Sequence, residues 1–169
     1  MTTRPVQRAC LGPRAAAVLS SAAIMPWSTA TELDELVERF RARTLPKSEW
    51  THRTHLAVGT WHVHQHGAEE ALGMLRSGII LLNEAHGTIN SDTSGYHETI
   101  TRAYVRLIAD FLAARPDAPT ADCVHALLAS PLAARTALFL YYSEGRLMSV
   151  SARRGWLEPD LAPLRLPPT

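Results

Sequence analysis

The chain has 169 residues, of which 46% are hydrophobic and 20% are charged, enough apolar material for one folded domain. No apolar run reaches the roughly 18 residues of a membrane span, so we expect none. The 17 basic and 16 acidic residues give a net charge of +1, which argues against a nucleic-acid partner, since such a partner requires a basic face. Cys10 and Cys123 are too few for a disulfide framework or a thiolate zinc site.

The N-terminal stretch differs in composition from the remainder. Residues 1–30 contain three arginines and no acid, and residues 15–25 are mildly apolar. This is the outline of an export signal, but the apolar stretch is short and holds two serines. We therefore predict a disordered extension over 1–27, a helical domain over 28–157 and an extended proline-rich tail over 158–169, in a cytoplasmic protein.

Apolar residues recur at helical spacing through most of the chain, and no segment alternates as a strand would. The first predicted helix is capped by Thr31 or Ser28 and ended by Pro46. The next three run from Ser48 to His66, from Ala68 to Ala85 and from Tyr96 to Ala114. They are followed by a helix capped by Thr120, one from Pro131 to Tyr142, and a short one after Ser149. Gly67 is expected to separate the second and third helices. Because the connections are short, we predict an all-α, single-domain antiparallel bundle of about six helices.

Histidine is the unusual residue of this sequence. There are eight, and seven of them lie between His52 and His97. On a helix, at about 100° per residue, His52, His55, His62 and His66 share one arc with Gly59. His52 and His55 are spaced i, i+3, close enough to bind one ion or to share a proton.

His97 and Glu98 begin the fourth predicted helix, where the ring of His97 falls on the apolar face and needs a partner. We hypothesise a mononuclear metal site between two helices, with His52, His55 and His97 as ligands. Glu98 would be a fourth ligand, a hydrogen-bond partner of a ligand, or a general base. Imidazole suits zinc, iron, copper or nickel, so the sequence predicts a divalent transition metal without naming one.

The same residues allow simpler interpretations. Histidines near a helix end, such as His62, His64 and His66 before Gly67, often cap carbonyls or face solvent. An inward histidine is more often hydrogen-bonded in a core than bound to a metal. Two alternatives therefore stay open: a metal-free isomerase or cyclase in which histidine and glutamate move protons, and a non-catalytic bundle that binds a small molecule.

A second group of candidates lies near the C-terminus. Tyr142 is a candidate catalytic residue, because its phenol can donate a proton. Arg146 is a candidate substrate-binding residue, because a guanidinium can hold a carboxylate through two hydrogen bonds. The alternative for Arg146 is that it caps a helix end and pairs with Glu144 or Glu158.

Taken together, these patterns predict a small enzyme, a metal-dependent hydrolase, lyase or oxygenase, that acts on an anionic small molecule. Trp50 and Tyr96 are further candidates for substrate contacts, with core packing as the alternative for Trp50. We expect Arg102 to pair with Glu98 at i, i+4. Bundles of this size often dimerise, so a homodimer is allowed for.

Four motifs in combination resemble those of a family of small bacterial helical proteins. They read WTHxxHL at 50–56, GYHETxT at 95–101, YYSxxRLxS at 141–149 and EPDLAPL at 158–164. The resemblance covers roughly residues 31–165 and implies no activity. It does imply that the four motifs belong to one set.

Overall fold

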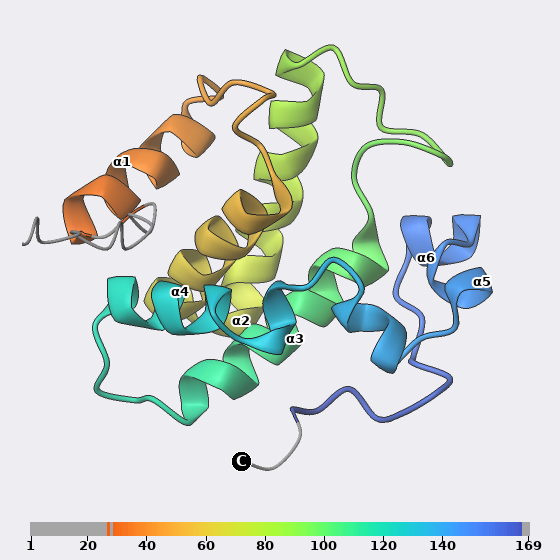
Figure 1. The fold of residues 1–169 in the computed structure, drawn as a ribbon. Helices are drawn as coiled ribbons and strands as arrows, with labels where there is room; N and C mark the ends of the chain where they lie inside the picture. The colour runs from red at the N-terminus through yellow and green to blue at the C-terminus, as the bar shows by residue number, and fades with distance from the viewer. Residues whose placement is uncertain (1–26, 28, 167–169) are drawn as a thin grey trace, which may run out of the picture.

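The computed structural model describes residue 27 and residues 29–166, and this part of the chain is all-α, with six α-helices and no strand (Figure 1). The predicted fold class is therefore confirmed. Apart from Trp27, the predicted N-terminal extension lies outside the described residues. No helix in the described ranges combines the length and the hydropathy that a membrane crossing needs.

Helix α1 (Ala30–Arg41) begins at Thr29, not at the predicted Thr31 or Ser28. The Thr29 side chain accepts a hydrogen bond from the backbone of Glu32, and the Glu32 side chain accepts one from the backbone of Thr29. This reciprocal capping box outweighs the other hydroxyls nearby because it satisfies two free N–H groups at once. The buried residues of α1 follow the predicted helical spacing: Leu33, Leu36, Val37 and Phe40.

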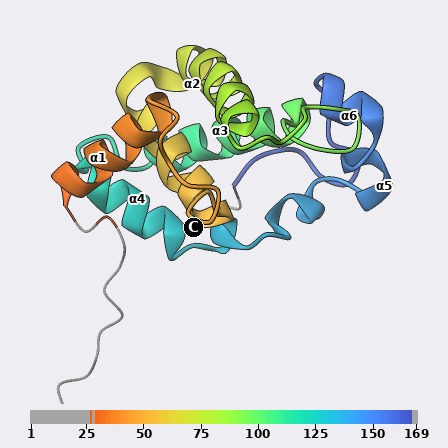
Figure 2. The same ribbon diagram turned by 90° about the horizontal axis from the view of Figure 1, so that it is seen from above.

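Helix α2 (His52–Ala85) is two helical segments joined at Gly67, where the predicted break is confirmed as a kink. Gly67 has φ 73° and ψ 168°, a backbone conformation that is essentially restricted to glycine. The helix starts after Thr51, whose hydroxyl caps it, rather than at the predicted Ser48. The kink lets α2 contact α1, α3 and α4, and α2 forms the centre of the fold (Figures 1 and 2).

Helices α3 (Glu98–Ala113) and α4 (Thr120–Leu128) both pack against α2. The start of α3 lies two residues after the predicted Tyr96, because the His97 side chain is its cap. Thr120 is the first residue of α4 and Pro119 is its N-cap, so the predicted capping role of Thr120 is wrong, and α4 has no side-chain cap.

The predicted helix from Pro131 to Tyr142 is wrong. The chain instead forms two short 3-10 turns, Pro131–Ala133 and Ala137–Leu140, separated by Ala134 in an extended conformation (φ −70°, ψ 134°). Leu132 and Leu138 are both buried. On a continuous helix these two positions would lie about 120° apart around the axis, whereas the break at Ala134 lets both side chains face the core.

Two short helices follow, α5 (Glu144–Leu147) and α6 (Val150–Arg154). The predicted short helix after Ser149 is confirmed as α6, with the Ser149 hydroxyl as its cap. Helix α5 was not predicted, because four residues are too few to show a helical period. Helix α6 packs against α3, which places both on one side of the molecule (Figure 1).

Candidate functional site

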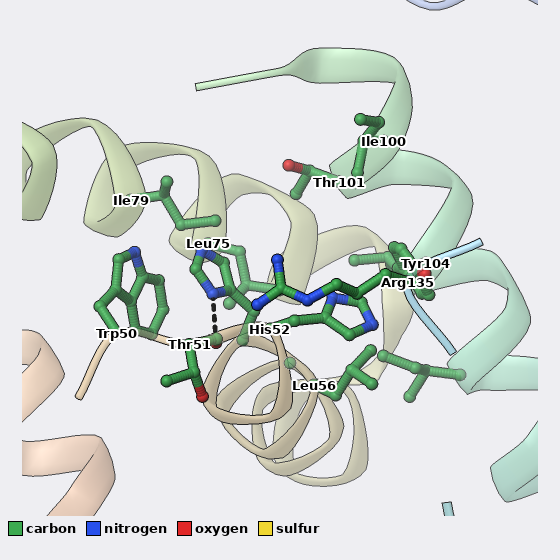
Figure 3. A pocket seen from close by; sticks show the side chains of 14 residues that line it. Trp50, Thr51, His52, Leu56, Leu75, Ile79, Ile100, Thr101, Tyr104 and Arg135 are labelled. Atoms are coloured by element: carbon green, nitrogen blue, oxygen red, sulfur yellow. Dashed lines mark hydrogen bonds between the residues drawn. The ribbon is translucent and has the colours of Figure 1, made fainter. Parts of the chain in front are cut away.

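A cavity of about 350 Å³ lies between α3 and the two segments of α2 (Figure 3). A cavity of this size suits a small organic molecule. No aspartate or glutamate is among its lining residues. Its apolar wall consists of Leu56, Leu75, Ile79, Ile100, Val105 and Ile108.

Gly59 keeps one side of this cavity open. It lies on α2 on the same arc as His52 and His55, as predicted from the sequence. A Cβ atom at Gly59 would lie 3.3 Å from Cδ1 of Ile108, which is closer than ordinary contact. Glycine therefore lets α2 and α3 approach while the adjacent histidines still face the cavity.

The predicted pair His52 and His55 does reach a common cavity. His55 Nδ1 donates to the carbonyl of Thr51 at 2.7 Å, which fixes the ring and leaves Nε2 as an acceptor. Its ring stacks on Trp50, with centroids 3.7 Å apart. The ring of His52 meets the edge of Tyr104 at 5.6 Å, and its buried Nε2 atom has no hydrogen-bond partner among the described residues.

Both imidazoles are held neutral. Burial, opposed by the hydrogen bond to the carbonyl of Thr51 and aided by the nearby His52 and Arg135, lowers the pKa of His55 to about 4. Burial and the Arg135 charge also lower the pKa of His52, although the carbonyls of Ala133 and Ala134 oppose this shift. At neutral pH the cavity therefore offers uncharged histidines, each able to accept or donate a hydrogen bond.

Arg135 was not among the site residues predicted from the sequence. Its side chain extends across the cavity toward Trp50 (Figure 3), and it makes no ion pair or hydrogen bond with any described residue. One sequence signal could have found it: no acidic residue occurs between Asp122 and Glu144, so Arg135 has no local partner. It is the group that gives the cavity its positive charge.

His97 does not line this cavity with His52 and His55, although it lines an adjoining cavity with His55. Its Nδ1 accepts the backbone N–H of Ile100 at 3.3 Å, and its Nε2 donates to the carbonyl of Leu147 at 3.0 Å. Both ring nitrogens are therefore used in capping α3 and tying it to α5. The hypothesis of three imidazoles meeting at one point is not supported by this arrangement.

The described residues include no group of three or more His, Cys, Asp or Glu side chains placed to hold a metal ion. A site of two histidines alone falls short of the three or four protein ligands that zinc sites use. The donor set therefore does not fit the predicted zinc, iron, copper or nickel centre, and we derive no chemistry from a metal.

Glu98 is engaged by a partner that the sequence analysis did not foresee. Arg76 binds it through two hydrogen bonds of 2.8 and 2.5 Å, and the hydroxyl of Tyr96 donates to it at 2.8 Å. These contacts lower the pKa of Glu98, so it stays a carboxylate. The predicted partner Arg102 instead lies over the ring of Trp156, 5.2 Å from its centroid. Glu98 is absent from the cavity lining.

The C-terminal candidates hold the last segment of the chain in place. Tyr142 donates to the carbonyl of Leu157 at 3.0 Å, and Arg146 donates through Nε to the carbonyl of Glu158 at 2.7 Å. Neither residue lines the cavity. For Arg146, the arrangement resembles the structural alternative, except that the acceptor is the backbone of Glu158 and not its carboxylate.

Three of the four motifs contact one another. His97 of the second motif donates through Nε2 to the carbonyl of Leu147 in the third, and the Ser143 hydroxyl of the third donates to Asp160 of the fourth at 2.6 Å. The Thr99 hydroxyl also donates to the carbonyl of Gly155 and accepts from the backbone N–H of Leu157. The cavity is lined by the first motif, through Trp50, His52 and His55, and by the second, through Ile100 and Thr101.

Comparison with known proteins yields no match: no family model, no curated protein and no solved structure resembles this chain. We therefore infer the function from the residues that line the cavity.

Proposed function

We propose that this protein binds a small organic acid in the cavity between α2 and α3, without a metal. The observation that carries the proposal is the unpaired Arg135 guanidinium beside a cavity lined by no acidic residue. A free cation at a partly enclosed apolar site favours an anion, because the attraction between the charges is less screened there than in open water. A carboxylate would also accept two parallel hydrogen bonds from the guanidinium.

The rest of the cavity complements such a ligand. Six aliphatic side chains provide an apolar wall for its carbon skeleton. The hydroxyl of Tyr104 makes no hydrogen bond to a described residue, and burial raises its pKa to about 12, so it stays protonated and can donate. His52, which is neutral at pH 7, adds a second polar side chain to the lining. Few polar groups on an apolar wall are typical of small-molecule sites.

A metal-free enzyme is the second candidate, and His52 favours it. Its imidazole lines the cavity beside Arg135 and is neutral at pH 7, so it could accept a proton from a bound acid. Incubation of the protein with each ligand it binds, followed by mass spectrometry, tests for turnover. Turnover that persists in the presence of chelators and is lost in His52→Gln would support this candidate. Recovery of every ligand unchanged would show that the protein binds without catalysing a reaction.

Binding is tested by calorimetry with straight-chain monocarboxylates of four to ten carbons and their uncharged primary amides. We expect saturable binding of the acids. Arg135→Gln should weaken acid binding about tenfold to a hundredfold, because it removes a charge-assisted contact worth roughly 1.5–3 kcal/mol, and should leave amide binding unchanged.

Arg43→Gln is the matched control, because Arg43 is also an exposed arginine and lies outside the cavity lining. It removes the same net charge and should leave acid binding intact. An equal loss in the two variants would show that the effect is a general charge effect. That result, or no saturable binding of any acid, overturns the proposal.

The metal hypothesis is tested in parallel with the metal alone. Protein that has been treated with a chelator is titrated with zinc, passed through gel filtration and submitted to elemental analysis. We expect less than one bound zinc ion per chain. Stoichiometric zinc that is lost in a variant carrying both His52→Gln and His55→Gln would contradict a metal-free site.

A further inference from the structure

A second cavity adjoins the first beside Trp50 and His55. It measures about 480 Å³ and shares with the first cavity the residues Trp50, His55, Ile79, Ile100 and Thr101. We call it the rear chamber. Its remaining wall comes from the residues around Lys47, from the end of α2, from the loop before α3 and from Arg153 of α6.

Two residues that line the rear chamber carry buried N–H donors with no acceptor among the described residues. The indole Nε1 of Trp50 and the Nε of Arg153 are both buried and have no partner among the described residues. In Figure 3 the indole nitrogen lies on the side of the ring away from Thr51. A buried N–H without an acceptor costs free energy, so two of them at one chamber indicate that an acceptor from outside belongs there.

The charges around the rear chamber also favour a group with acceptor oxygens. Lys47 and Arg153 line it, and no aspartate or glutamate does. Lys47 contacts only the neutral hydroxyl of Thr88, at 3.1 Å, and Arg153 donates through Nη1 to the carbonyls of Gly95 and Tyr96. Neither cation forms an ion pair with a described residue.

The other polar side chains of the chamber already have partners within the protein. His86 donates to the carbonyl of Leu45, Asn83 donates to Asn90, and the Tyr96 hydroxyl donates to Glu98, which lies outside the lining. Apart from the Nε2 acceptor of His55, which also faces the first cavity, the unmet capacity consists of N–H donors and positive charge. Such a set is satisfied by an anionic group with several acceptor oxygens, not by a cation or an apolar group.

We propose that the rear chamber binds a second acid group of the same ligand, so that the natural ligand is a dianion with one acid group at Arg135 and the other at Lys47, Trp50 and Arg153. This inference rests on the proposed function, because the first acid group is placed by Arg135. It specifies the ligand class further, from a monoacid to a diacid. The residues that line both cavities would flank the carbon chain between the two acid groups.

The test compares each straight-chain monocarboxylate of four to ten carbons with the α,ω-dicarboxylate of the same length, by calorimetry. At one preferred length we expect the diacid to bind about tenfold more tightly than the monoacid. Trp50→Phe removes the indole N–H but keeps an aromatic ring for stacking, and Lys47→Met removes the charge. Lys47→Met should weaken diacid binding several-fold and leave monoacid binding unchanged, because Lys47 lies outside the lining of the first cavity. Trp50 lines both cavities, so the readout for Trp50→Phe is the ratio of diacid to monoacid affinity, which should fall several-fold.

Two negative results are distinguishable. If monoacids bind and the diacids bind no more tightly at any length, the rear chamber is not an acid site and this inference is overturned, while the proposed function stands. If neither series binds, the proposed function fails, and this inference fails with it.

A second readout does not depend on any variant folding. Lys47 is the only lysine among the 17 Lys and Arg residues, and it is exposed, so its amine is a unique side-chain target for acetylation by an N-hydroxysuccinimide ester. Peptide mass spectrometry separates it from the N-terminal amine. Saturating diacid should slow acetylation of Lys47 several-fold relative to an equal occupancy of monoacid. Equal rates with the two ligands would overturn the inference.

Discussion

The indole ring of Trp50 stacks on the imidazole of His55, with centroids 3.7 Å apart and planes inclined by 30°. Phe40 in turn stacks on Trp50 at 5.2 Å. The hydrogen bond from His55 to the carbonyl of Thr51 fixes the ring in a second direction. The rings of Trp50 and His55, which line both cavities, are therefore held in one geometry before any ligand arrives. This lowers the conformational entropy that is lost on binding.

Acid should destabilise this protein through its buried histidines. The pKa values of His55 and His62 are lowered to about 4 in the folded chain, chiefly by burial, against about 6.5 for an unperturbed histidine. The unfolded chain therefore takes up these protons first, and stability that is present above pH 6.5 is lost as the pH falls toward 4. For His62, which is 1% exposed, the loss is on the order of 3 kcal/mol.

Urea unfolding at pH 7, 6, 5 and 4.5 measures this loss. His62→Asn keeps an N–H near the position that now donates to the carbonyl of Val58, but it cannot take up the proton. This variant should be less stable at pH 7, because a smaller side chain leaves space in the core, and its stability should fall less steeply with acid. An unchanged slope would show that His62 does not contribute.

Two buried threonines form a matched pair. Thr99 and Thr60 are both 0% exposed. The Thr99 hydroxyl makes two hydrogen bonds to the tail, whereas the Thr60 hydroxyl has no partner among the described residues. Thr99→Val should lower the free energy of unfolding by about 1–3 kcal/mol, because Gly155 and Leu157 lose their partner.

Thr60→Val makes the same chemical change without breaking a hydrogen bond. It should be neutral or stabilising, because it removes a buried hydroxyl that nothing satisfies. Both free energies come from the same urea unfolding experiment. Equal losses in the two variants would contradict a bonding role for Thr99.

Two glycines of α2 should respond in opposite ways to alanine. At Gly78 a Cβ atom would overlap the ring of Phe40, which is 1% exposed and stacks on Trp50. Gly78→Ala should destabilise by about 1–3 kcal/mol, because the ring can move only by disturbing that stack. At Gly73 a Cβ atom would meet nothing within 4 Å.

Gly73→Ala should therefore stabilise the protein by about 0.5–1 kcal/mol, the ordinary gain of alanine over glycine in a helix. Thermal unfolding of both variants measures the difference. A stabilising Gly78→Ala would show that the Phe40 ring is not held where the structure places it.

The sequence by itself determined the features that depend on neighbouring residues. Helical spacing identified the buried face of α1 and placed His52 and His55 on one side of α2, because residues three and four apart share a face. Gly67 marked the kink, because only glycine readily adopts the backbone conformation found there. Ser149 marked α6, because a hydroxyl at that position caps a helix start.

Only the tertiary structure decided which side chains became partners. Glu98 binds Arg76, 22 residues away, and His97 binds the carbonyl of Leu147, 50 residues away. Arg135 reaches the cavity because the chain leaves the helical path at Ala134. None of these pairings has a local period or spacing, since each is set by how distant segments pack. The sequence could therefore place histidines at a cavity, but it could not identify the cation beside them.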